Sequence, residues 1–172
     1  TFHGHEALGA VMVHRIFKRL KLPLDHHMKY VQKLVRYHLR PISLTKEDIT
    51  DSAIRRLLFD AGDDIDDLMI LCEADITSKN EKKVKRLLEN YEMVRSKLKE
   101  IEDKDKIRNW QPPVSGELIM ETFDLKSGPM IVELKNEIRE AILEGDLEND
   151  FSAAYNFLIH LGKERGLTKK QS

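Results

Sequence analysis

Three polar side chains of metal-ligand type stand out in this sequence, and each lies on a different predicted helix. They are His5, His38 and Asp75, and each is polar in an otherwise apolar neighbourhood. Neutral imidazole and carboxylate groups are ligands that divalent transition metals accept in proteins. The three side chains are therefore the candidate metal ligands of the chain, although their spacing alone does not fix whether they converge on one ion.

Positive charge is concentrated in separate stretches of the chain. Residues 14–40 contain eight Lys or Arg and one acid, whereas residues 60–75 contain seven acids and no base. The net charge of −1 hides this segregation. Basic helix faces can hold the phosphates of a nucleic acid, and solvated helix faces are the plain alternative. The residues that we expect to contact phosphates are Arg15, Lys18, Arg19, Lys33, Arg36, Arg40, Lys79, Lys82, Lys83 and Arg86.

Helical periodicity runs through nearly the whole chain, and no segment shows sustained strand alternation. Apolar residues recur at steps of three and four over 8–20, 24–39, 51–61, 65–77 and 80–101. Prolines end the first two of these helices. The residues predicted to cap later helices are Asp51, Asn80, Ser115 and Asp150. The pattern predicts an all-α protein.

Proline also divides the chain. Residues 109–114 contain Trp110 and two consecutive prolines, which exclude a continuing helix. We predict a first helical unit over 1–108, a proline-containing strap over 109–114 and a smaller helical unit over 115–172. Trp110 is interpreted as a packing anchor of this organisation.

Composition limits the class of protein. A chain of 172 residues with 41% hydrophobic residues can bury a core. Its single cysteine, Cys72, excludes a disulfide framework and is expected to be a small buried hydrophobe. No apolar run approaches the roughly 20 residues that span a bilayer. We therefore expect a soluble, cytoplasmic protein with no membrane partner.

Signatures of other enzyme classes are missing from the sequence. The glycines form no phosphate-binding loop, and no nucleophile elbow is present. The acidic run at 60–67 lacks the alternating ligands and closing Glu of a calcium loop. Acids at a helix start complement the helix dipole instead. No catalytic residue is predicted.

Two groups of motifs follow one another along the chain. The first group consists of Gly-His-Glu at 4–6, Leu-Val-Arg-Tyr-His at 34–38 and Cys-Glu-Ala-Asp-Ile at 72–76, with Lys79 close behind. The second consists of residues 116–120, 125–129 with a Gly-Pro pair, Leu134 and 141–145. In this order, the first group is similar to the HD-containing body, and the second to the C-terminal unit, of the bacterial tRNA nucleotidyltransferases of the poly(A) polymerase/CCA-adding family.

The resemblance implies an HD-domain-like helical bundle followed by a smaller C-terminal helical unit. It implies that His5, His38 and Asp75 are the remaining positions of an HD metal motif. We expect the leading His and the His-Asp dyad of this motif, together with a catalytic head, upstream of this sequence. Glu117 stands where the family more often has Asp, and Val132 where it often has a second Gly. Both departures are mild.

The function that this resemblance implies is tRNA binding in an enzyme that adds nucleotides to the tRNA 3′ end. The missing head would use Mg²⁺ and nucleoside triphosphates, whereas this fragment alone is expected to be inactive and to hold no cofactor. Its expected partners are tRNA and the head domain, and the sequence leaves open a homodimer. Two alternatives stay open: the remnant of an HD-type metal-dependent phosphohydrolase, and a helical scaffold without a ligand.

Overall fold

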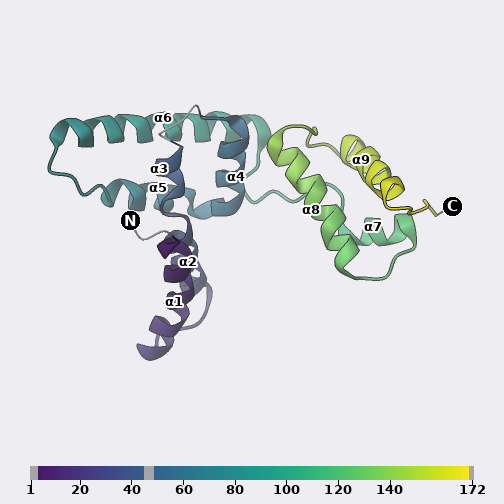
Figure 1. Cartoon of the computed structure of the whole chain (residues 1–172), viewed down its shortest axis with the longest axis horizontal. Helices are drawn as coiled ribbons and strands as arrows, with labels where there is room; N and C mark the ends of the chain where they lie inside the picture. The colour runs from purple at the N-terminus through teal and green to yellow at the C-terminus, as the bar shows by residue number, and fades with distance from the viewer. Residues whose placement is uncertain (1–3, 45–48, 171–172) are drawn as a thin grey trace. The chain divides into compact units, whose positions relative to one another are not determined.

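A computed structural model describes residues 4–44 and 49–170 of the chain (Figure 1). All regular secondary structure in these residues is helical, which confirms the predicted all-α fold class. Residues 1–109 and 110–172 form two compact units. In the part of the chain that the structure describes, no helix is both long enough and apolar enough to cross a membrane.

The first unit begins with a pair of antiparallel helices, α1 (His5–Arg19) and α2 (His26–Tyr37). They lie side by side in Figure 1. Gly9 allows this close packing, because a Cβ atom at Gly9 would lie 2.9 Å from Cγ1 of Val35. The amide of Gln32 also donates a hydrogen bond of 3.1 Å to the carbonyl oxygen of Ala10. The pair therefore holds the start of α1 beside the end of α2.

The core of the first unit lies among the later helices. These are α3 (Arg40–Ser43), α4 (Asp51–Ala61), the short 3₁₀ helix η1 (Gly62–Asp64), α5 (Ile65–Ala74) and the long α6 (Glu81–Asp105). The fully buried side chains that they share include Ile54, Leu57, Leu58, Ile65, Leu68, Met69, Tyr91, Val94 and Ile101. Cys72 is also buried, as predicted.

The second unit contains α7 (Gly116–Phe123), α8 (Pro129–Glu144) and α9 (Phe151–Glu164). Its core is formed by Val114, Ile119, Phe123, Ile131, Leu134, Ile138, Ile142, Ala154, Leu158 and Leu161. Trp110 packs against this core, which confirms its role as a packing anchor. Gly145 ends α8 at φ 89°, a conformation that favours glycine.

Local capping fixes several helix starts. The side chain of Asn80 accepts a hydrogen bond of 3.1 Å from the amide of Lys83, and Ser115 and Asp150 cap α7 and α9 in the same way. These three predictions are confirmed. The prediction for α4 is wrong by one residue, because Thr50 provides the cap and Asp51 is the first helical residue. Asp51 still places its carboxylate favourably at the positive end of the helix.

The apolar stripe of α1 differs from a usual core-facing stripe. Leu8, Val11 and Leu20 are 60%, 61% and 58% exposed, whereas the buried residues of α1 are Ala10 and Val13. The small Ala10 and Val13 face α2 because the two helices approach closely there. The sequence period therefore predicts the helix correctly but not the face that the first unit buries.

Candidate functional site

His5 and His38, two of the three predicted metal ligands, lie in direct contact. Their Nε2 atoms are 3.2 Å apart although the residues are 33 positions apart in sequence. The hairpin of α1 and α2 causes this contact, since His5 begins α1 and His38 directly follows α2. Two nitrogen ligands on a tetrahedral zinc ion, each about 2.05 Å from the metal, would lie about 3.4 Å apart. The pair is thus spaced as two ligands of one ion.

Hydrogen bonding fixes the proton on one of these rings. Nδ1 of His38 lies 2.7 Å from the carbonyl oxygen of Val35. Because a carbonyl only accepts, Nδ1 of His38 must carry a proton, and Nε2 of the neutral ring is then an acceptor. His5 donates its Nε2–H to that atom. Nε2 of His38 therefore presents a lone pair that a metal can accept, and His5 can supply a second Nε2 ligand only in the tautomer that carries its proton on Nδ1.

Asp75, the third predicted ligand, shares a pocket with His38. The pocket has a volume of about 210 Å³ and lies where α2 and α5 end and α6 begins. Lys83 from the first turn of α6 and Tyr91 also line it. The pocket therefore combines an imidazole, a carboxylate and an ammonium group.

Two neutral groups line the same pocket. Burial, with the nearby Asp75 and Glu73 carboxylates, raises the pKa of the Cys72 thiol to about 12. Burial also raises the pKa of the Tyr91 hydroxyl to about 12. The Cys72 thiol donates a hydrogen bond of 2.9 Å to the carbonyl oxygen of His38. Cys72 is consequently a structural thiol, because the thiolate that nucleophilic chemistry requires is disfavoured.

The three predicted ligands do not form a compact ligand set. Among the described residues, only Asp25, His26 and His27 bring three ligand atoms within 4.8 Å of one another. These three are exposed. Asp25 is explained by helix capping, because its carboxylate accepts a hydrogen bond of 2.9 Å from the amide of His27. Desolvation opposes the shift, but this bond and the two adjacent imidazoles lower the pKa of Asp25 below its usual value.

The ten basic residues predicted to contact phosphates divide into two groups. Lys33 and Arg40 are engaged within the first unit. Lys33 donates to Asp64 at 2.6 Å and to the carbonyl oxygen of Ala61 at 3.1 Å, and Arg40 pairs with Asp60. The remaining eight are exposed and form no ion pair or hydrogen bond with the residues that the structure describes; they are Arg15, Lys18, Arg19, Arg36, Lys79, Lys82, Lys83 and Arg86.

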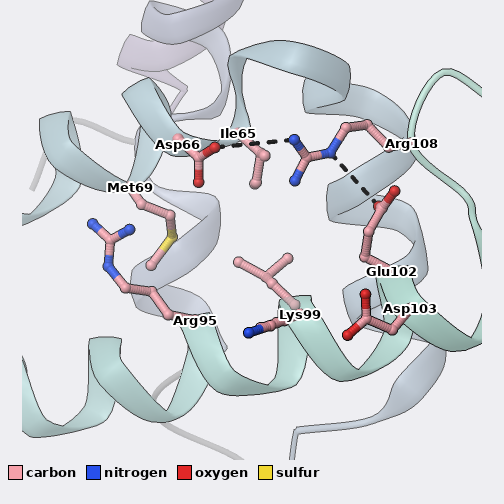
Figure 2. A pocket seen from close by; sticks show the side chains of 9 residues that line it. Ile65, Asp66, Met69, Arg95, Lys99, Glu102, Asp103 and Arg108 are labelled. Carbon is pink, nitrogen blue, oxygen red and sulfur yellow. Dashed lines mark ion pairs between the residues drawn. The ribbon is translucent and has the colours of Figure 1, made fainter.

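A larger pocket, of about 490 Å³, lies between α5, α6 and the residues that follow α6 (Figure 2). Figure 2 shows the guanidinium of Arg108 between the carboxylates of Asp66 and Glu102. No sequence pattern marks Glu102 and Arg108 as site residues, and Asp66 is one member of the acidic run at 60–67. No local motif could have revealed them, because Asp66 and Arg108 are brought together only by the return of α6 along α5.

Comparisons with protein-family models, with curated proteins and with solved structures find no match to this chain.

Proposed function

We propose that this chain is an RNA-binding helical module of the kind that holds tRNA in tRNA nucleotidyltransferases. The observation that carries the proposal is the exposure of eight predicted phosphate contacts, none of which pairs with an acid in the described residues. A cation without an internal partner keeps its full charge for an external anion. The motif resemblance in both units supports tRNA as that partner.

The cations of α1 form a row near the end of the helix. Arg15, Lys18 and Arg19 are spaced at three and four residues, so they share one face of the helix. Arg36 of α2 is a separate charge, because it lies beside Glu6 and Ala7 at the start of α1. Successive phosphates of an A-form helix suit such a row, because double-stranded RNA is recognised by its shape and backbone.

The second basic cluster begins just before α6. Lys82, Lys83 and Arg86 lie on its first turns, and Lys83 borders the pocket that contains His38 and Asp75. The cluster therefore lies beside the candidate metal ligands. In the proposed role these residues bind RNA and do not transfer nucleotides.

The experiment is a salt titration of tRNA binding to the full chain. We expect weak binding whose affinity falls steeply with salt. The triple variant Arg15→Ala/Lys18→Ala/Arg19→Ala should lower the slope of log K against log salt concentration by roughly three, one for each lost phosphate contact.

The matched control removes the same charge elsewhere. Lys104, Lys126 and Lys163 are exposed lysines outside the proposed surface, and their replacement by alanine should leave most of the slope intact. Binding that is indifferent to salt, or an equal loss in both triple variants, would contradict the proposal.

A second candidate, an HD-type metal-dependent phosphohydrolase remnant, is favoured by the 3.2 Å contact between His5 and His38. A metal ion there could polarise a phosphate and activate water. Elemental analysis of the purified protein separates the two candidates: tightly held, near-stoichiometric transition metal supports the hydrolase. If neither RNA nor metal binds, the scaffold interpretation is favoured.

A further inference from the structure

The larger pocket of the first unit has an apolar floor and a charged rim. Ile65 and Met69 from α5 and Leu98 from α6 form the floor, and all three are buried. Lys99, Glu102 and Arg108 belong to the polar part of its lining (Figure 2). Ligand-binding pockets commonly combine an apolar lining with a few polar groups, and about 490 Å³ is within their usual size.

Two buried polar atoms in this pocket lack hydrogen-bond partners. They are Oε2 of Glu102 and Nε of Arg108. These atoms lie 3.6 Å apart, which is an ion-pair distance but too long for a hydrogen bond. Leaving such groups unsatisfied is costly. These two atoms have almost no accessible surface, but the side chains of Arg108 and Glu102 are 32% and 27% exposed, so a ligand that offers an acceptor beside a donor can reach the outer atoms of the guanidinium and the carboxylate.

The cations of the pocket are not equally available. Arg95 is held by Glu73, with both Nε and a terminal nitrogen 2.9 Å from the same carboxylate oxygen. Lys99 is exposed and has no ion pair or hydrogen bond with a described residue. Because Lys99 lies three positions before Glu102, the two side chains share a face of α6. Lys99 is therefore the cation that can receive an anionic group of a bound ligand.

We propose that this pocket binds one unpaired nucleotide of RNA. This inference rests on the proposed function and adds a contact to single-stranded RNA to the contacts that the basic residues make. The base lies against Met69 and Leu98. Its Watson–Crick edge accepts from the Arg108 guanidinium and donates to the Glu102 carboxylate, and its phosphate contacts Lys99. Every base carries a neighbouring donor and acceptor on that edge, and pairing occupies both. The pocket thus selects unpaired nucleotides, unlike the row of cations on α1.

The experiment is an NMR titration of the isotope-labelled full chain with three probes: CMP, cytidine and ribose 5-phosphate. We expect CMP to shift backbone amide signals of residues 65–69 and 95–108. Ribose 5-phosphate should bind more weakly, because it lacks the base. Lys99→Ala should lower the affinity for CMP about tenfold, because one charge-assisted hydrogen bond to the phosphate is lost. The affinity for cytidine should not change, because cytidine has no phosphate.

The matched control is Lys104→Ala, an exposed lysine of α6 outside the pocket, which should not change CMP binding. The double variant Glu102→Leu/Arg108→Met removes both hydrogen-bonding atoms together and avoids leaving one charge buried alone. It should bind CMP no more tightly than ribose 5-phosphate.

The proposal is overturned if CMP and ribose 5-phosphate bind equally well, if CMP leaves the pocket amides unchanged, or if Lys99→Ala and Lys104→Ala behave alike. Failure of the two proposals can be told apart. If CMP has no effect on the pocket but tRNA binding still depends on salt, only the nucleotide pocket is refuted. If tRNA does not bind but CMP still shifts the pocket signals, only the basic surface is refuted and the pocket is supported.

Discussion

Nε2 of His5 and Nε2 of His38 lie 3.2 Å apart, and Nδ1 of His38 is fixed by the carbonyl oxygen of Val35. This arrangement joins the start of α1 to the end of α2 through two side chains that can both bind metal. It makes the α1–α2 pair sensitive to the chemical state of two imidazoles. The proposed RNA-binding surface begins on the same two helices.

Zinc should stabilise the chain through this histidine pair. In a His26→Gln/His27→Gln background, which removes the exposed Asp25–His27 cluster, saturating Zn²⁺ should raise the unfolding temperature by about 2–4 °C. His38→Gln should abolish the increase, whereas His160→Gln, at an exposed histidine of α9, should not. Differential scanning calorimetry measures the shift. An equal shift with His38→Gln would show that zinc binds elsewhere.

The ion pair between Arg55 and Asp105 should be important for the first unit. Nε of Arg55 lies 2.7 Å from Oδ2 of Asp105, and the two side chains are only 12% and 18% exposed. Asp105→Ala would leave a largely buried guanidinium without this partner and should lower the free energy of unfolding by about 2 kcal/mol.

The double variant Arg55→Met/Asp105→Leu should recover part of that loss, because neither charge is then left unpaired. Urea denaturation of both variants provides the measurement. If the double variant is less stable than Asp105→Ala, the unpaired guanidinium is not the main cause of the loss, and the ion pair itself stabilises the first unit.

Gly162 should be intolerant of any side chain. A Cβ atom there would lie 2.2 Å from Cζ of Phe123, a buried ring between α7 and α9. Because the ring is packed in the core, Gly162→Ala should destabilise the second unit by about 1–3 kcal/mol. Gly116→Ala is the control, since its Cβ atom would lie 3.4 Å from the nearest side-chain atom. Thermal unfolding followed by circular dichroism compares the two.

Alkaline pH should weaken the first unit. The pKa of Cys72 rises from an ordinary value of 9.0 to about 12, and that of Tyr91 from 10.0 to about 12. Between these values the unfolded chain releases protons that the folded chain retains, so the free energy of unfolding falls as pH rises from about 9 toward 12. Tyr91→Phe should make this fall shallower. Urea titrations at several pH values test it, and an unchanged slope in Tyr91→Phe would refute the assignment.

Local sequence signals predicted most of the secondary structure. Helix periods, the caps at Asn80, Ser115 and Asp150, and the glycine after α8 each depend on interactions within a few residues. For the same reason the error at α4 was small: Thr50 and Asp51 are both good capping residues, and only the backbone conformation distinguishes them.

Helical periodicity and the positions of the charged residues are both visible in the residues alone. The tertiary structure decided which of those charges are available: Lys33 and Arg40 are neutralised by acids that follow them by 31 and 20 positions, whereas Arg36 is exposed. Helix packing also brings His5 into contact with His38 and places Arg108 beside Glu102 in the lining of one pocket. Such pairings depend on how helices pack against one another, and this long-range information is not contained in the spacing of residues along a single helix.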